Sequence, residues 1–298
     1  MNLMKKIVIK IYRFFFNKIR YLNIFKNITI KYHYKNFSIL IPLYHSLPDY
    51  QKKNPKYDKI LPVICKYIKQ NEMIIDIGAN IGDSLAAMVD ENSNPIYLCI
   101  EPEDEFFSYL TMNLKIIQKK IPNLKVHLLK QFVGKQITNI SFDIKKEGSA
   151  KANLINGNIK SKSLDEILNN FETIEKIRLL KTDVDGFDYD VLESSLKTIE
   201  QHKPLIFFEC EYEQEYQKIN FKSIIKKLQS LGYFHWTIFD NYGEIIITTQ
   251  NLSTIYSLME YVWRQNLGKT TRTIYYFDLL ACCDNNKEIF DNVIKEVE

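Results

Sequence analysis

The chain has 298 residues, 46% of them hydrophobic and 26% charged, which is the composition of a folded globular protein and excludes disorder for most of its length. Nine Gly and eight Pro are too few for a collagen-like or Pro-rich protein, and the apolar runs are too short to cross a membrane. The formal net charge of +4 is unevenly spread. Residues 1–48 contain nine Lys and Arg and no acidic residue, so the other 250 residues carry 31 basic against 36 acidic side chains. The sequence thus predicts a mildly acidic body behind a basic arm.

The basic arm is predicted to occupy residues 1–57 and to consist of an amphipathic helix followed by a β-hairpin. On a helical wheel one face carries Val8, Ile11, Phe15, Ile19 and Leu22, and the opposite face carries Lys6, Lys10, Arg13, Asn17 and Arg20. Such a helix either lies on an anionic membrane surface, giving a peripheral contact through residues 1–25, or packs its apolar face on the protein itself. Segments 28–34 and 37–43 are predicted to be the strands of the hairpin.

Residues 58–298 are predicted to form one α/β domain, because helical and strand patterns alternate along them. Helices are predicted at 58–70, 83–89, 104–119, 164–168, 189–196 and 221–231, with one more between the strands of the last third and another at the end of the chain. Strands are predicted at 73–77, 96–100, 126–130, 177–181, 205–208, 235–239, 244–249 and 273–281, with a hairpin around 140–144. This alternation indicates a mostly parallel sheet with helices on both faces.

The five cysteines are scattered, and they include no Cys-x-x-Cys pair and no nearby His at zinc-ligand spacing. We interpret them as small apolar residues of a protein in a reducing compartment. No secretory signal is recognisable, because Lys and Arg interrupt the apolar stretch of the first 25 residues. The expected location is therefore the cytoplasm, at the inner face of a membrane if the arm binds lipid.

The segment after the first predicted strand of the domain runs from Asp76 to Asp83 and contains Gly78 and Gly82. Ligands of doubly wound sheets bind outside the carboxyl ends of the strands, so this segment is a candidate binding loop. Glycines allow a tight turn and a close approach of the backbone to a ligand, and the next helix directs the positive end of its dipole to the same place. Asp76 is placed to hold an amino group or a ribose hydroxyl.

Glu101 follows the second predicted strand, a position from which a carboxylate accepts hydrogen bonds from both hydroxyls of a ribose. NAD and S-adenosylmethionine both contain a ribose. A dinucleotide site uses Gly-x-Gly-x-x-Gly and places a pyrophosphate at the helix N-terminus. Here Asn80 takes the place of the second Gly, and Asp76 and Asp83 flank the loop. These carboxylates repel a pyrophosphate and attract the cationic S-adenosylmethionine, which favours methyl transfer.

Asp183, Asp185 and Asp188 follow the strand predicted at 177–181. Asp183 and Asp185 are the catalytic candidates, and Asp183 is placed to orient the donor or to help deprotonate a substrate hydroxyl. The alternative is that this pair binds Mg²⁺, which prefers carboxylate oxygens. Glu209, after the next strand, is expected to face the same cleft.

Six short strings within residues 70–212 resemble, in the same order, those of the FkbM family of S-adenosylmethionine-dependent methyltransferases. They are IDIGANIGD at 75–83, IEP at 100–102, VG at 133–134, SLDEI at 163–167, LKTDVDGFD at 180–188 and PLIFFE at 204–209. In the fifth string the family has Glu before the Gly, whereas this chain has Asp185, which keeps the charge on a shorter side chain.

The resemblance implies the class I methyltransferase fold, a Rossmann-like, mostly parallel seven-stranded sheet with helices on both faces. It also implies transfer of a methyl group from S-adenosylmethionine to a hydroxyl oxygen, often of a sugar or polyketide. The implied cofactor residues are Asp76, Gly78, Asn80 and Gly82 at the methionine part, Glu101 at the ribose, and Gln131 and Phe132 at the adenine, with Asp183 near the methyl group.

The acceptor is expected to be a small molecule or glycan of the kind used in polysaccharide biosynthesis, and a lipid-linked acceptor would suit the basic arm. Two other functions remain open, an NAD(P)-dependent oxidoreductase and a non-catalytic module that binds S-adenosylmethionine or a glycan. Nucleic-acid methylation, which the basic arm suggests, is disfavoured by the acidic body and by the lack of an Asn-Pro-Pro-Tyr-like string. Side chains that either contact the acceptor or pack in the core are His45, His235, Trp236, Tyr242, Trp263 and Tyr275.

Overall fold

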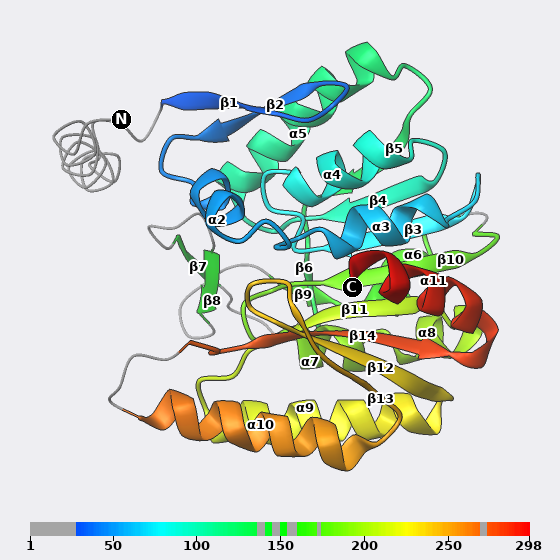
Figure 1. The fold of residues 1–298 in the computed structure, drawn as a ribbon. Coiled ribbons are helices and arrows are strands. Elements are labelled where there is room, and N and C mark those ends of the chain that lie inside the picture. Colours follow the sequence, from blue (N-terminus) through cyan, green and yellow to red (C-terminus); the bar gives the residue numbers. More distant parts are fainter. Residues whose placement is uncertain (1–27, 136–140, 145–149, 154–159, 172–173, 269–272) are drawn as a thin grey trace, which may run out of the picture.

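The computed structural model describes residues 28–135, 141–144, 150–153, 160–171, 174–268 and 273–298. The helix predicted within residues 1–25 lies outside this part of the chain. The described part is built around an eight-stranded sheet of order β13-β12-β14-β11-β10-β3-β4-β5 (Figure 1). In chain order these strands are β3 (Met73–Ile77), β4 (Ile96–Ile100), β5 (Lys125–Leu129), β10 (Ile177–Thr182), β11 (Leu205–Cys210), β12 (Tyr233–Asp240), β13 (Ile245–Thr249) and β14 (Phe277–Cys283).

Five adjacent strands, β5, β4, β3, β10 and β11, run parallel. β14 is antiparallel to both β11 and β12, and β12 turns back into the antiparallel edge strand β13. The predicted α/β class and mostly parallel sheet are thus confirmed, but the sheet has eight strands and not seven. The additional edge pairing comes from the β12–β13 hairpin, whose turn ends at Gly243 with a φ of 83°.

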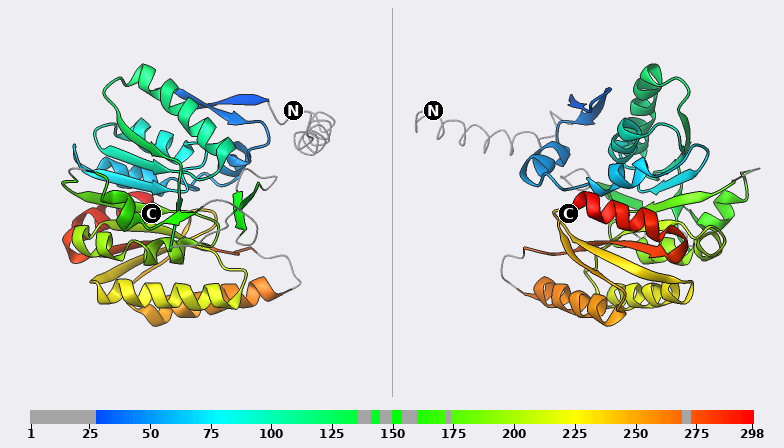
Figure 2. Two further views of the ribbon diagram at one scale, coloured as in Figure 1. Left: turned by 180° about the vertical axis from the view of Figure 1, so that it is seen from behind. Right: turned by 45° about the vertical axis from the view of Figure 1, so that its right-hand side comes forward.

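Both faces of the sheet are buried, because its central strands are continuous apolar runs. In β3, Ile74 packs on one face while Ile75 and Ile77 pack on the other, as the alternation of strand side chains requires. One face is covered by α3, α4, α5 and α11, and the other by α6 to α10 (Figures 1 and 2). These helices are α3 (Ile60–Lys66), α4 (Asp83–Glu91), α5 (Asp104–Lys120), α6 (Leu164–Leu168), α7 (Asp188–Glu193), α8 (Leu196–His202), α9 (Glu215–Ser230), α10 (Leu252–Leu267) and α11 (Lys287–Val297). All five cysteines are buried and free.

The predicted hairpin of the arm is present and lies beside α5 (Figure 2). The side chain of Asn113 in α5 exchanges two hydrogen bonds of 2.8 Å with the backbone of Leu40 and donates a third, of 2.9 Å, to the carbonyl of Ile81. The Tyr34 hydroxyl donates to the carbonyl of Asp83 at 3.0 Å. The hairpin is thereby fixed against the loop after β3.

The remaining elements are short. The hairpin consists of β1 (Thr29–His33) and β2 (Ser38–Pro42), and it is followed by α2 (Leu47–Lys53). Further pairs of strands lie outside the large sheet: β6 (Phe132–Val133) pairs with β9 (Ser161–Lys162), and β7 (Ser141–Ile144) pairs with β8 (Ala150–Asn153). The 3₁₀ helix η2 (Asp284–Asn286) precedes α11.

The strand order reverses between β3 and β10, which are neighbours in the sheet. From β3 the chain continues outward to β4 and β5, and from β10 it continues in the opposite direction to β11. In sheets of this kind the reversal opens a crevice at the carboxyl ends of the strands, and ligands bind there. The loops after β3 and β10 are therefore the place to look for a site. Within the described residues, no helix is both long and apolar enough to cross a membrane.

Candidate active site

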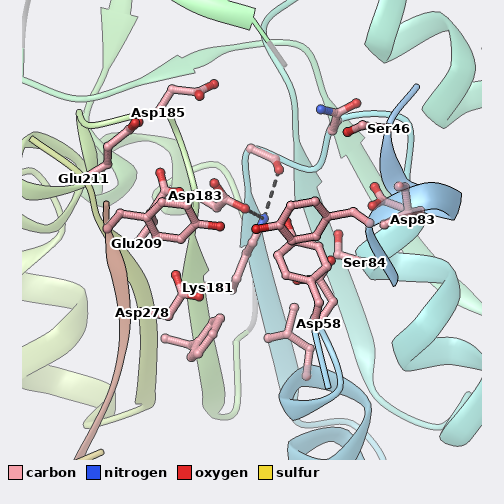
Figure 3. A pocket seen from close by; sticks show the side chains of 18 of the residues that line it. Ser46, Asp58, Asp83, Ser84, Lys181, Asp183, Asp185, Glu209, Glu211 and Asp278 are labelled. Atoms are coloured by element: carbon pink, nitrogen blue, oxygen red, sulfur yellow. Dashed lines mark hydrogen bonds and ion pairs between the residues drawn. The ribbon is translucent and has the colours of Figure 1, made fainter. Parts of the chain in front are cut away.

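A cavity of about 590 Å³ lies at the carboxyl ends of β3, β10 and β11, where the strand order reverses (Figure 3). Residues of α2, of the segment that follows it and of the start of β14 line its other sides. Acidic side chains dominate the lining, with Asp49, Asp58, Asp83, Asp183, Asp185, Glu209, Glu211 and Asp278 against Lys53, Lys181 and His45. Such a lining attracts cations and repels phosphate groups.

The loop after β3 approaches the loop after β10 so closely that only glycine fits at position 78. A Cβ atom on Gly78 would lie 1.9 Å from the carbonyl oxygen of Asp183, and the residue has a φ of +77°. Gly78 and Asn80 line the cavity, whereas Gly82 is the N-cap residue of α4 and packs on Leu110 outside the lining. Two of the four residues predicted for the methionine part of the cofactor thus reach the cavity directly.

Lys181 is the central charged residue of the site, and the sequence analysis did not select it. Its Nζ atom lies 2.9 Å from Asp76 Oδ1 and 3.7 Å from Asp183 Oδ2, and it donates a hydrogen bond of 3.0 Å to the carbonyl of Gly78. Burial alone would lower the pKa of this ammonium, but the carboxylates of Asp76 and Asp183 raise the pKa above its ordinary value. Lys181 therefore stays charged and ties β3, its loop and the loop after β10 together. The sequence does contain a signal for this role, because Lys181 lies inside an apolar strand and a buried charge needs a partner of opposite charge.

Asp76 lies beneath the cavity, where it is 1% exposed. It accepts a hydrogen bond of 2.5 Å from the hydroxyl of Ser84, in the first turn of α4, in addition to its ion pair with Lys181. Both partners line the cavity, while Asp76 itself does not. The carboxylate thus positions two lining side chains from below.

Glu101 lies at the end of β4, where it is 5% exposed and outside the cavity lining. Its two oxygens accept hydrogen bonds from the backbone N–H groups of Asn80, at 2.8 Å, and Glu103, at 2.9 Å. Burial raises its pKa to about 7 although these hydrogen bonds lower it. A carboxylate oxygen accepts at two lone pairs, so each oxygen retains one for a ribose hydroxyl. Glu101 also fixes the position of the loop that contains Gly78 and Asn80.

Gln131 and Phe132, the residues predicted for the adenine, lie away from the cavity lining. Phe132 is buried in β6 with its ring centroid 6.4 Å from that of Phe187, and Gln131 Nε2 donates to the carbonyl of Lys160 at 2.6 Å. The structure thus brings Gly78, Asn80, Asp183 and Asp185 together around the cavity and places these two residues elsewhere.

Asp183 and Asp185, the predicted catalytic pair, both line the cavity, but β10 ends before them at Thr182. The loop rather than the strand sets their directions, and Asp185 has a φ of 52°. Asp188 fixes this loop, because its carboxylate accepts hydrogen bonds from the Thr182 hydroxyl at 2.8 Å and from the backbone of Val184 at 3.4 Å. Burial raises the pKa of Asp188 to about 8.

The last third of the chain contributes part of the cavity wall, as does the segment before α3. Of the six residues considered for the acceptor, His45 and Tyr275 line the cavity. The others do not: Trp236 is fully buried in the core, Tyr242 donates to the carbonyl of Thr273, the Trp263 ring contacts Lys218, and His235 contacts Asp284. Glu209 lines the cavity as expected, and Glu211 joins it. Lining residues that the sequence did not suggest include Tyr50, Tyr57, Asp58, Tyr276 and Asp278.

The carboxylates do not form a recognisable metal site. Among the residues that the structure describes, no group of three or more His, Cys, Asp or Glu side chains is arranged to hold a metal ion. The ionisable side chains of the described lining are thus mainly carboxylates, with two lysines, one histidine and several tyrosines.

Comparisons with known proteins bear on the family and the fold. The family model described as "Methyltransferase FkbM domain" matches residues 76–234. Among curated proteins none matches this chain. A solved FkbM methyltransferase from Methylobacillus flagellatus is 16% identical with a TM-score of 0.35, and the match covers 55% of this chain but only 48% of that protein. The plantazolicin methyltransferase BpumL in complex with SAH (S-adenosylhomocysteine) is 11% identical over 80% of this chain and 88% of that one, with a TM-score of 0.39. A human methyltransferase 10 domain containing protein is 12% identical over 83% and 88%, with a TM-score of 0.43.

The match to the family model spans more than half of the chain and includes the loops after β3, β4, β10 and β11. It confirms the resemblance seen in the sequence, and with it the class I methyltransferase fold. The chain belongs to the FkbM family of S-adenosylmethionine-dependent methyltransferases.

Proposed function

We propose that the protein transfers a methyl group from S-adenosylmethionine to a hydroxyl oxygen of a sugar, glycan or related small molecule. The observation that supports this proposal is the acidic cavity at the strand reversal, with Gly78 and Asn80 on one side and Asp183 within it. Carboxylates suit the sulfonium and amino groups of S-adenosylmethionine, and the same charges oppose the pyrophosphate of NAD. The residues present therefore fit the methyl donor better than a dinucleotide.

Each part of the donor has residues suited to it. Gly78 and Asn80 would hold the methionine part, and Glu101 would accept from the ribose with its remaining lone pairs. When bound, S-adenosylmethionine supplies an activated methyl group, whose C–S bonding electrons return to sulfur as a lone pair of the acceptor oxygen forms the C–O bond. The Asp183 carboxylate, 53% exposed, is the group we assign to take the proton released from that oxygen, and Lys181 holds it in place.

Calorimetric titration tests the donor, with S-adenosylmethionine and NAD as the two ligands. We expect saturable binding of S-adenosylmethionine and none of NAD, and binding of NAD alone would contradict the proposal. Transfer of radiolabelled methyl to glycan, lipid-linked sugar and free sugar fractions then identifies the acceptor class. Asp183→Asn should lower transfer with little change in donor affinity, whereas Glu288→Gln, an exposed residue of α11, serves as the unaffected control.

The basic arm supports a second part of the proposal, contact with the cytoplasmic face of an anionic membrane that carries a lipid-linked acceptor. The supporting observation is the separation of basic and apolar residues within residues 1–25. Deleting these residues should abolish co-sedimentation with phosphatidylserine vesicles and leave donor binding intact. Unchanged co-sedimentation would show that the arm has another role.

A further inference from the structure

Three carboxylates, those of Asp58, Glu209 and Asp278, form what we call the acceptor end of the cavity. Glu209 in β11 and Asp278 in β14 are direct partners in the antiparallel register, so two acidic residues stand opposite each other on neighbouring strands. Like charges in this arrangement destabilise a sheet. Asp58 lies across the cavity, on the same side of Lys181 as Asp83 and Ser84, while Glu209 and Asp278 lie on the other side (Figure 3).

Among the residues that the structure describes, no cation is paired with these three carboxylates. Their side chains make no hydrogen bond or ion pair within the described part of the chain, although Glu209 and Asp278 are backbone partners in the sheet. Glu209 Oε2 is closed off from solvent and lacks a hydrogen-bond partner there. The buried cation nearest to the cluster, Lys181, already has its ion pair with Asp76. The three side chains are half-buried, and a positive charge among them would relieve the repulsion between their carboxylates.

The raised pKa values of the cluster agree with a role in binding a cation. Burial, followed by the charges of Asp83 and Asp183, raises the pKa of Asp58 to about 8. Burial and the neighbouring carboxylates, Asp183 foremost, also raise the pKa values of Glu209 and Asp278 well above their ordinary range. A cation bound among these groups would bring them back to their charged forms.

Aromatic rings complete this end of the cavity. Tyr57, Tyr275 and Tyr276 are among its lining residues. The charges of Asp58, Asp278 and Glu209 act on the hydroxyl of Tyr57, and the charges of Asp278 and Glu209 act on that of Tyr276, so rings and carboxylates are close neighbours. Carboxylates combined with aromatic faces are well suited to an ammonium group.

Two of the three carboxylates, Glu209 and Asp278, are separate from the residues assigned to the donor, whereas Asp58 faces them from the side of Asp83 and Ser84 (Figure 3). Along the sheet the donor residues follow β3 and β4, whereas Glu209 and Asp278 belong to β11 and β14, on the far side of β10. Asp58 and Asp278 also lie outside the family match at 76–234. The residues assigned to the donor therefore do not place its positive charge beside Glu209 and Asp278, and an acceptor that enters this side of the cavity is a ligand able to bring one.

We propose that the acceptor carries a protonated amino group, as an amino sugar or amino alcohol does, and that Glu209, Asp278 and Asp58 hold this group while a hydroxyl of the same molecule faces the donor methyl. This inference rests on the proposed function. A protonated amine has no lone pair and cannot take the methyl group, so the carboxylates select the oxygen as the nucleophile. The bond changes are those given above for transfer to oxygen, with the proton passing to Asp183.

The test compares amines with their neutral N-acetyl counterparts in protein saturated with SAH, so that the donor site is occupied. Saturation-transfer NMR, which detects weak binding, is used with glucosamine and N-acetylglucosamine and with galactosamine and N-acetylgalactosamine, at a pH at which the amines are protonated. We expect the amines alone to bind. Glu209→Gln and Asp278→Asn should each weaken amine binding by about tenfold and leave SAH binding unchanged, with Glu288→Gln as the control.

Equal binding of both members of each pair, binding of neither, or amine binding that survives both substitutions would overturn the inference. When an amine is methylated, NMR of the product should show a methyl ether, and an N-methyl product would contradict the holding role. The same titrations without SAH separate this inference from the proposed function. If SAH does not bind, the assignment of the donor residues is wrong. Binding of the amine at Glu209 and Asp278 can still be measured on the protein without SAH, so this inference is tested independently.

Discussion

The two ends of the cavity contrast in how their charged side chains are paired. At the donor end, defined by Asp76, Gly78, Asn80 and Lys181, the chain supplies the partners itself, since Lys181 pairs with Asp76 and bonds to the carbonyl of Gly78. At the acceptor end, the side chains of Asp58, Glu209 and Asp278 have no hydrogen-bond or ion-pair partner among the described residues. The contrast teaches that the donor end is preorganised, whereas the carboxylates at the acceptor end are available to a ligand.

The largest effect is expected from Gly78→Ala, which breaks the donor end. The added Cβ would lie 1.9 Å from the backbone of Asp183, so the two loops would have to separate. We expect donor affinity to fall by at least about a hundredfold, measured by calorimetry. Gly232→Ala is the matched control, because Gly232 also has a positive φ, +96°, but its Cβ would meet only Cys283 Sγ, at 3.9 Å. Equal effects of the two substitutions on donor binding would show that backbone strain, and not the contact between the loops, is what matters.

Lys181→Met should rank second, because it leaves the buried carboxylate of Asp76 without its cation. Removing one partner of a buried ion pair costs about 3–5 kcal/mol of unfolding free energy, measured by chemical denaturation. The double variant Lys181→Met/Asp76→Asn should recover part of this loss, because it removes the uncompensated charge. A double variant no more stable than Lys181→Met would contradict the pairing.

The acceptor end should make the ligand-free protein less stable as the pH rises. The folded-state pKa of Asp58 is raised from 3.8 to about 8, so its contribution to stability is complete below the lower value and is lost as the pH rises toward the higher one. Melting temperature should therefore fall less between mildly acidic and mildly alkaline pH in Asp58→Asn than in the unchanged protein. If the melting temperatures of the two proteins changed with pH in parallel, Asp58 would lie in a solvated environment, and the prediction would be wrong.

The last comparison neutralises one carboxylate at each end, and the smallest effect is expected from the substitution of Asp278. Asp76→Asn should lower the melting temperature because it removes the partner of Lys181. Asp278→Asn should leave it unchanged or raise it slightly, because it removes repulsion across the β11–β14 pair. A clear loss of stability in Asp278→Asn would reveal a partner for that carboxylate within the protein.

Much of the fold and the donor end is predictable from the sequence, because these features are local. Buried strands are recognisable in the sequence as short apolar runs. Once the end of each strand is known, the carboxylates that follow it, such as Glu101 and Asp183, are predicted to lie at the same edge of the sheet. The edge strand β13 is itself predictable, because it corresponds to the segment 244–249, and the count of seven strands is what the family resemblance implies. The eighth strand is therefore a departure from the family and not from the pattern of this sequence.

The missed residues depend on long-range contacts. Lys181 acquires its role only when β10 lies beside β3, which brings it to Asp76. Asp58 and Asp278 are 220 positions apart in the chain, and only the closed fold places both on one cavity. No local motif marks such residues, although a charged side chain within an apolar strand, as at Lys181, is a usable signal.

A crystal structure of the protein with SAH would test the central claim most directly. The account predicts that the amino acid part lies at Gly78 and Asn80 and the ribose at Glu101, with Glu209 and Asp278 left free for an acceptor. An SAH molecule whose amino group is bound between Glu209 and Asp278 would contradict both the position of the donor and the division of the cavity into two ends.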